Sequence, residues 1–321
     1  MIIQLYRKIR KRIRKFRQFK VEIRTIKKLK FHLLSDYKDV IDKYREVKAP
    51  CPFNEPNMNI WFMWWQGLDH MPDVIKINYD ALLINANGNK VIFVAHDNIK
   101  DYIQMPDYIL EKVKKGIISL THLSDLIRAK ILNEHGGLWL DATIHVSRPI
   151  DNLTSLTYWS PKWIIPKSDK NKYRLWAGLW NVSSVPKLMM TQCMGIWFSV
   201  KDNPIFACLE EFWLSYWKNE NDTPYYWTTE VFLIGCMYDE IHTVKKQIDA
   251  LQLSNSKVFD LRDQINEIPN KTILKFFLSD TQFFYLRWKS EYKEYAENIQ
   301  KLTLYGHLLR DSQFLNRLNL N

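Results

Sequence analysis

The sequence predicts an α/β fold in which a mixed sheet is flanked by helices, and two features of the chain carry this prediction. Between residues 59 and 150, short apolar runs typical of buried strands alternate with segments of helical periodicity. Strands that alternate with helices build βαβ units, whose crossovers are right-handed and whose strands are parallel. Between residues 156 and 200, tryptophan-rich apolar runs predict an antiparallel continuation of the same sheet.

The elements follow one another at short spacing. The first unit combines a strand over residues 60–65, a helix around residues 72–82 and a second strand over residues 90–95. A short strand at residues 117–119 is expected to begin the next unit. Later, Asn203 and Pro204 introduce a helix that continues to about residue 216, since Asn is a good N-cap and Pro is tolerated in a first helical turn.

One stretch in the middle of the chain organises the rest. Ser124 is expected to cap a helix, which Gly136 and Gly137 end because glycine tolerates a positive φ. Residues 138–140 are an apolar run short enough for a fully buried strand, and Asp141 follows directly. A carboxylate at the carboxyl end of a buried strand lies where α/β sheets bind their ligands.

Taken singly, Asp125 and Asp141 are also explained as a helix-terminus residue and a turn residue. The combination is more specific: Ser-Asp-x-x-Arg at residues 124–128, then Gly-Gly, an apolar strand and an acidic tip. It resembles the glycosyltransferases of capsular polysaccharide synthesis, relatives of the sugar transferases that carry an Asp-x-Asp motif. In this chain Thr143 stands in place of the second acid, as in the capsular branch.

The resemblance implies a GT-A type glycosyltransferase domain over residues 51–321. Such an enzyme moves a sugar from a nucleotide-sugar, here expected to be a UDP-sugar, to a glycan or lipid-linked acceptor in capsular or surface polysaccharide synthesis. Related families mostly retain the anomeric configuration. A second hypothesis is a membrane-associated scaffold or regulator that keeps the fold and has lost catalysis, with Thr143 as the sign of that loss.

The resemblance also assigns roles to individual residues. A divalent ion, Mn²⁺ or Mg²⁺, is expected to bridge Asp141 and the phosphates of the donor, with Thr143 and His307 as further ligands. Asp125 is expected to hold hydroxyl groups of the donor sugar. Arg128 is expected to pair either with the phosphates or with Asp125, because guanidinium suits both.

Other candidates lie at the ends of predicted elements. The resemblance places Trp65 and Gln66, at the end of the first strand, in the nucleotide pocket, whereas Trp61 is expected in the core. Glu230, ahead of a helix, is a candidate for catalysis or for contact with the acceptor. Three more polar residues are candidates for contact with the ligand: His96, Asn98 and Lys289.

The basic residues are concentrated at the N-terminus. Residues 1–30 hold 13 Lys and Arg against a single acid, Glu22, although the whole chain carries a net charge of +11. The remaining residues are therefore close to neutral. Apolar side chains recur in the same segment every three or four residues, which predicts a basic amphipathic helix. This apolar stripe consists of Ile2, Leu5, Ile9, Ile13, Phe16, Phe19, Ile23 and Ile26.

Three partners suit such a helix. An anionic membrane surface is favoured, since basic charge beside an apolar stripe is typical of interfacial helices. A second copy of the helix would give a homodimer through a coiled coil. Nucleic acid is disfavoured, because the rest of the chain has no basic patch. Residues 1–50 are expected to form an arm that ends at Pro50, and the chain is expected in the cytoplasm, peripheral on the inner face of the plasma membrane.

Several classes of protein are excluded by what the sequence lacks. The four cysteines, Cys51, Cys193, Cys208 and Cys236, have no metal-ligand spacing, which suits a reducing compartment. No apolar run is long enough to span a bilayer, and no signal peptide is recognised. The glycine motifs of dinucleotide-binding and P-loop proteins are absent, which disfavours NAD chemistry and excludes P-loop chemistry.

Overall fold

The computed structural model describes residues 2–165, 174–187, 189–190, 195–222, 225–253, 258–271, 273–274, 281–297 and 299–318. Of the residues singled out in the sequence, Cys193 lies outside this part of the chain.

Within the described residues, the central sheet is mixed and has the strand order β2–β1–β3–β8–β5. Its strands are β1 (Asn59–Met63), β2 (Lys90–Val94), β3 (Gly137–Asp141), β5 (Tyr158–Trp159) and β8 (Ile196–Ser199). β1 is parallel to both β2 and β3, and β8 and β5 continue the sheet antiparallel. Met63 is in register with Val94 and with Asp141, so the three parallel strands end at one edge.

Among the described residues, two short strand pairs lie outside this sheet. They are β4 (Ile144–Val146) with β9 (Phe283–Tyr285), and β6 (Trp163–Ile164) with β7 (Met189–Met190). The helices of eight or more residues are α1 (Ile2–Asp36), α3 (Asp73–Asn85), α4 (Asp107–Lys114), α5 (Leu120–Glu134), α7 (Pro204–Asn219) and α10 (His242–Ala250). The shorter α-helices are α2 (Lys38–Tyr44), α6 (Arg174–Leu179), α8 (Thr228–Glu230), α9 (Tyr238–Glu240), α11 (Asp260–Gln264), α13 (Leu304–Arg310) and α14 (Phe314–Leu318). A π-helix, η4 (Val231–Met237), joins α8 to α9, and the 3-10 turns in the described part of the chain include η1 (Leu68–His70) and η2 (Ile99–Asp101).

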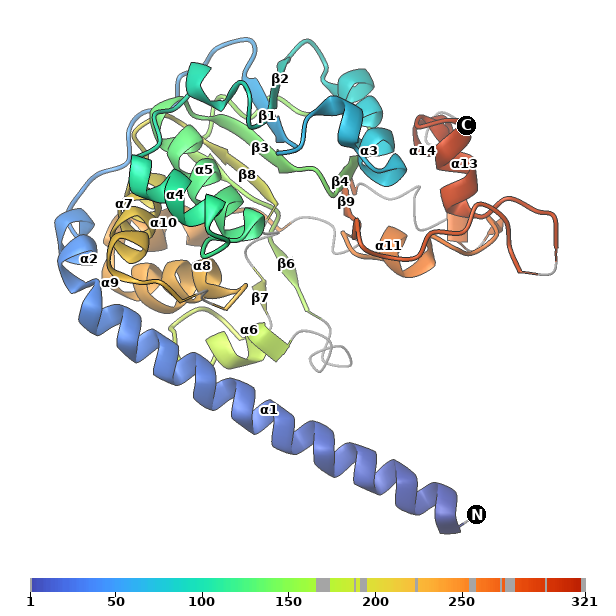
Figure 1. Ribbon diagram of the computed structural model, residues 1–321, viewed down its shortest axis with the longest axis horizontal. Helices are drawn as coiled ribbons and strands as arrows, with labels where there is room; N and C mark the ends of the chain where they lie inside the picture. The colour runs from blue at the N-terminus through green and yellow to red at the C-terminus, as the bar shows by residue number, and fades with distance from the viewer. Residues whose placement is uncertain are drawn as a thin grey trace.

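The helices form layers beside the sheet. α5 packs against β3 and β8, and α7 packs against α5 from the next layer, while α3 lies beside β4 at the other end of the sheet (Figure 1). α7 begins with Asn203, whose side chain accepts a hydrogen bond from Ile205 N at 3.1 Å, as its sequence predicts. Trp61, which the sequence predicts to be core, is 2% exposed, and other large aromatic side chains such as Trp139 and Trp197 are also buried.

The prediction of a mixed sheet flanked by helices is confirmed, and two local predictions are wrong. Residues 117–119 are not a strand; Ser119 instead precedes α5, and its hydroxyl accepts from His122 N at 3.3 Å. The helix therefore starts before Ser124, which lies inside it and is not its cap. Capping by the earlier serine leaves Asp125 in the second turn, with its side chain buried.

α1 is one unbroken helix, and its second half packs on the body of the protein. Ile26, Leu33 and Tyr37 are each at most 3% exposed. They pack where α1 contacts α6 and η4, and where α2 contacts α7. In Figure 1 the N-terminal end of α1 projects well beyond the rest of the chain. An arm that ends at residue 50 stays a prediction, but a cut there would remove side chains that belong to the core.

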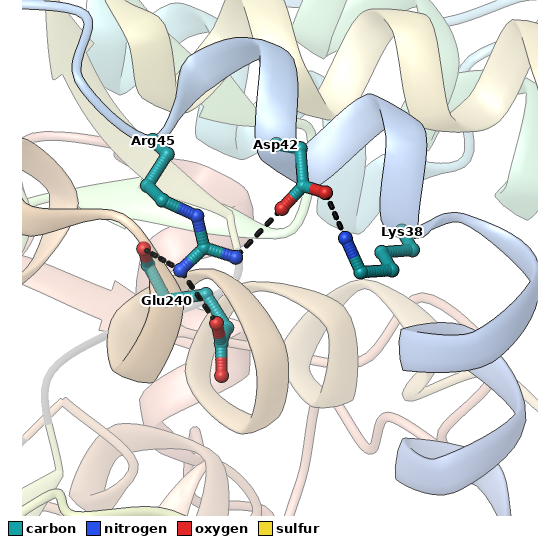
Figure 2. Close-up of polar contacts among 4 residues, drawn as sticks. All are labelled: Lys38, Asp42, Arg45 and Glu240. Carbon is teal, nitrogen blue, oxygen red and sulfur yellow. Dashed lines mark hydrogen bonds and ion pairs between the residues drawn. The ribbon is translucent and has the colours of Figure 1, made fainter.

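Ion pairs also join this region to the body. Arg45, just after α2, donates to Glu240 Oε2 at 2.8 Å and to Asp42 Oδ1 at 2.6 Å, and Lys38 also contacts Asp42 (Figure 2). These side chains are roughly one-third to two-thirds exposed, and exposed pairs contribute about 0–1 kcal/mol each. Apolar burial is therefore the main force that holds α1 and α2 in place.

In the part of the chain that the structure describes, no helix combines the length and the apolar character needed to cross a membrane.

Gly137 is required by the close approach of β1 and β3. Its φ is +97°, and a Cβ at this position would lie 2.5 Å from the carbonyl oxygen of Asn59. That oxygen belongs to the backbone of β1, so it cannot move without disturbing the sheet. The glycine therefore lets β3 pair with β1 and carry Asp141 to the edge.

We expect Gly137→Ala to lower the melting temperature far more than Gly116→Ala. Gly116 also has a positive φ, +72°, but within the described residues nothing lies within 4 Å of the position of its Cβ. The control should therefore cost only the strain of alanine in that conformation, about 1–2 kcal/mol. Equal destabilisation of the two variants, measured by thermal melting, would show that the contact with Asn59 does not matter.

Candidate active site

A cleft of about 930 Å³ opens at the edge where the parallel strands end. The ends of β1 and β3 contribute Trp65, Gln66, Asp141 and Thr143, and α5 contributes Asp125 and Arg128 among others. The structure therefore brings together most of the site residues that the sequence predicts. Glu230, at the end of α8, also lines this cleft.

Arg128 lies between two carboxylates at the base of the cleft. Its Nη1 donates to Asp141 Oδ1 at 3.1 Å, and its Nη2 donates to Asp125 Oδ1. Asp125 is one helical turn before Arg128, so the two side chains share a face of α5. The Arg128 side chain is 3% exposed, that of Asp125 is 9% and that of Asp141 is 27%. Asp141 is thus the member of the cluster most open to a ligand.

Aromatic rings hold this cluster in position. The guanidinium carbon of Arg128 lies 4.5 Å from the centroid of the Trp197 ring on β8. Trp139, two residues before Asp141 on β3, donates from Nε1 to Asp141 Oδ1 at 2.7 Å. Side chains two apart on a strand point to the same face, so β3 supplies both the acid and its donor. The cluster is therefore built from α5, β3 and β8 together.

The backbone around the acidic tip is fixed from three sides. Asp141 N donates to Gly195 O at 2.8 Å, and Leu286 N donates to Thr143 O at 2.8 Å. Between them, the Asn78 amide of α3 donates to Ala142 O at 2.9 Å. Because each anchor comes from a different element, the turn that carries Asp141 and Thr143 has little freedom to move.

Burial shifts the pKa values of two acids in the cleft upward. It raises the pKa of Asp125 to about 6, with Arg128 opposing the rise and Asp141 adding to it. Burial likewise raises the pKa of Glu230 to about 8, and the neighbouring Asp125 adds to that rise against the effect of Arg128. Glu230 is 6% exposed, and its Oε2 has no hydrogen-bond partner among the described residues. Glu230 is therefore protonated at neutral pH.

Four other candidates do not line the cleft in the described structure. His307 lies on α13, with its ring stacked on Phe314 at 4.5 Å between centroids, so it is not brought to Asp141. Lys289 lies over the ring of Trp288. Asn98 makes a local turn, accepting from Ala95 N at 2.8 Å. His96 packs its ring edge-on against Trp65, and its backbone N donates to Trp65 O at 3.1 Å.

Two groups of cleft residues were not found from the sequence. One is on α1, where Val21, Glu22, Thr25 and Ile26 line the cleft. The other is the aromatic run Tyr225–Trp227 just before α8. Three consecutive aromatic residues ahead of a helix are a usable local signal, whereas the position of α1 depends on packing between segments far apart in the chain.

The residues at the acidic tip fit a divalent cation only in part. Asp141 is a single carboxylate with Oδ1 already engaged by Arg128 and Trp139, and Thr143 offers a neutral oxygen. Across the residues that the structure describes, no cluster of three His, Cys, Asp or Glu side chains could enclose a metal ion. Mg²⁺ commonly binds through one or two carboxylates, waters and substrate phosphates. The donor set suits an ion that arrives with a diphosphate, rather than a closed metal site.

The fold and the cleft define an α/β protein with an acid–arginine–acid cluster at the carboxyl edge of its parallel strands. The chain belongs to the capsular polysaccharide synthesis protein family, whose model matches residues 8–308. A solved structure described as PaToxG Glycosyltransferase is 14% identical, covers 95% of this chain and 98% of its own, and has a TM-score of 0.34. No curated protein matches the chain. Family membership rests on the family model alone.

Glu230→Gln should change how stability depends on pH. With a pKa of about 8 in the folded protein and about 4.5 when unfolded, Glu230 keeps its proton in the native state over a range where the unfolded chain has lost it. The free energy of unfolding should therefore fall as pH rises through this range, by at most about 1.4 kcal/mol per pH unit. Glu230→Gln removes this loss, so its melting temperature relative to wild type should rise between pH 5 and pH 8.

Glu291→Gln is the matched control, because the Glu291 side chain is 81% exposed. Asp125 titrates in the wild type and in both variants, so its contribution to the pH dependence of stability cancels in the comparison. Melting curves of Glu230→Gln that run parallel to wild type across this range would show that Glu230 ionises normally.

Proposed function

We propose that this protein is a glycosyltransferase of capsular or surface polysaccharide synthesis, which moves a hexosyl group from a nucleotide-sugar to a glycan or lipid-linked acceptor. The observation that carries the proposal is the Asp125–Arg128–Asp141 cluster at the carboxyl edge of the parallel strands. Ligands of open α/β sheets bind at this edge. A UDP-sugar, a GT-A type site and retention of the anomeric configuration are the finer parts of the same proposal.

The charge of the cleft favours a donor that is bound together with a cation. Among the described residues that line it, four are acids and one, Arg128, is a base. With Glu230 protonated, a negative charge still remains, and it would repel a diphosphate directly. A divalent ion held by Asp141 would resolve this conflict, and Mn²⁺ or Mg²⁺ there would supply Lewis-acid stabilisation of the leaving nucleoside diphosphate.

Each residue of the cluster has a distinct part in this proposal. Asp141 and the Thr143 hydroxyl would hold the ion, and Arg128 would keep Asp141 oriented, because it already binds that carboxylate. The second carboxylate, Asp125, would accept hydrogen bonds from hydroxyl groups of the donor sugar. Trp65 and Gln66 would meet the nucleoside, the ring by stacking on the base and the amide by hydrogen bonds to its polar edge.

We also propose that the projecting part of α1 binds an anionic membrane surface from the cytoplasmic side. The sequence of residues 2–20 combines many Lys and Arg with an apolar stripe, and each basic residue near an anionic leaflet contributes about 1 kcal/mol. A homodimer through the same stripe is the competing use. Because α1 also lines the cleft, binding of the helix to a membrane would place the cleft close to a lipid-linked acceptor.

A panel of UDP-, GDP- and CMP-sugars, each with Mn²⁺ or Mg²⁺, tests the central proposal. Wild-type protein should hydrolyse or transfer from at least one donor, and Asp141→Asn should reduce that rate at least a hundredfold, because it removes the charge that holds the ion. Asp97→Asn, in the exposed turn after β2, is the control and should keep the wild-type rate. Because Asp141 pairs with Arg128, the variant is expected to melt at a lower temperature, and a melting temperature still well above the assay temperature would exclude loss of fold as the cause.

Two outcomes would contradict the proposal. Turnover of no donor by the wild-type protein would favour the catalytically inactive scaffold. A wild-type rate in Asp141→Asn would place the chemistry elsewhere.

The membrane proposal predicts that the full chain sediments with anionic vesicles at low salt and is released at high salt, because Lys and Arg contacts are screened. A chain that starts at Arg17 keeps Val21–Ile26 in the cleft and should stay in the supernatant. Equal sedimentation of both chains would overturn the membrane role. A full chain that is dimeric and binds no vesicles would assign the helix to dimerisation.

A further inference from the structure

The cleft has a second wall that the proposed donor site does not use. It is made by α1 (Val21, Glu22, Thr25 and Ile26), by α6 (Leu175 and Trp176) and by the segment Tyr225–Trp227. These parts lie together, since α1 packs against α6 and against η4, which continues the helix begun by α8. We call this the α1 wall. The residues of the proposed donor site come instead from α5 and from the ends of β1 and β3.

The α1 wall presents an open aromatic surface. Tyr226 is 74% exposed and Tyr225 is 53% exposed, although both line the cleft. The two rings are held in place by Trp227: Tyr225 stacks on it at 4.6 Å between centroids, and Tyr226 meets it edge-on. Exposed aromatic rings that are fixed in a concave site gain energy when a flat apolar face covers them. The C–H face of a pyranose is such a surface.

The α1 wall also carries polar side chains. Glu22 and Thr25 of α1 line the same wall, and Glu230 lies at its junction with the donor side. Burial raises the pKa of the Tyr226 hydroxyl, and the nearby acids Glu230 and Glu22 add to that rise, whereas Arg287 opposes it. A ring that stacks on Tyr226 would therefore have hydrogen-bond partners for its hydroxyl groups at the edge of the stack.

The size and charge of the cleft limit what this wall can bind. At about 930 Å³ the cleft is near the upper end of the roughly 300–1,000 Å³ typical of ligand pockets, which leaves room for a sugar unit beside a nucleotide-sugar. The surplus of acids among the described lining residues disfavours a negatively charged sugar. Uronic acids and phosphorylated sugars would be repelled, and neutral sugars would not.

We infer that the α1 wall is the acceptor subsite, and that it binds a neutral pyranose unit by stacking on Tyr226 with hydrogen bonds to Glu22 and Thr25. This inference rests on the proposed function, since it names the second substrate of the same cleft. It also gives α1 a part in substrate binding that is separate from any role at a membrane.

Binding of simple glycosides tests the subsite without knowledge of the natural acceptor. The probes are methyl glycosides of glucose, galactose, mannose and N-acetylglucosamine, with methyl glucuronide as the charged counterpart of the glucoside, measured by saturation-transfer NMR. At least one neutral glycoside should bind the full chain. Tyr226→Ala should weaken this binding about tenfold, Tyr226→Phe should retain it because the ring remains, and Tyr295→Ala, an exposed tyrosine outside the described cleft lining, should not affect it.

Other results would contradict either the inference or the proposed function. The inference is overturned if no neutral glycoside binds, if Tyr226→Ala binds as well as wild type, or if the glucuronide binds as tightly as the glucoside. Donor hydrolysis by the wild-type chain is scored in parallel. Its absence alone would remove the proposed function while leaving a sugar-binding wall, so the two failures can be told apart.

Discussion

A guanidinium buried between two carboxylates is the interaction on which the rest of the cleft depends. Arg128 binds Asp125 and Asp141 at once, and it joins a helix to the end of a strand in doing so. Removing one partner of a buried ion pair typically costs about 3–5 kcal/mol, because a charge is left without compensation. The same pairing fixes the orientation of Asp141, whose side chain remains partly open to the cleft. Stability and the proposed chemistry therefore depend on one group.

The cleft has more acidic than basic side chains among its described lining residues, and this surplus of negative charge limits which ligands suit it. In the proposed function an anionic donor would bind there together with a cation, whereas a neutral sugar would need none. Glu230 adds to the pattern, since burial keeps it protonated at neutral pH. A proton on Glu230 lets it donate a hydrogen bond that an ionised carboxylate could not donate.

Local patterns in the sequence predict much of the fold and the centre of the site. Buried strands were recognisable as short apolar runs, and Asp141 by its place after one of them. Asp125 and Arg128 are one helical turn apart, so their pairing was one of the two alternatives expected. The sequence predicts the start of α5 too late, because Ile117–Ser119 has the composition of a strand although Ser119 caps the helix. The α1 wall and the position of His307 depend on contacts between distant segments, for which no local pattern exists.

If the proposed function is correct, the cleft binds a nucleoside diphosphate through a cation held at Asp141. Titration of UDP and GDP into the wild-type protein by calorimetry, with and without Mn²⁺, measures this directly. We expect at least one nucleotide to bind, and its binding to weaken strongly when the ion is left out, since the acids of the cleft then face the phosphates without compensation. Binding of neither nucleotide, or binding that is equally tight with and without the ion, would contradict it.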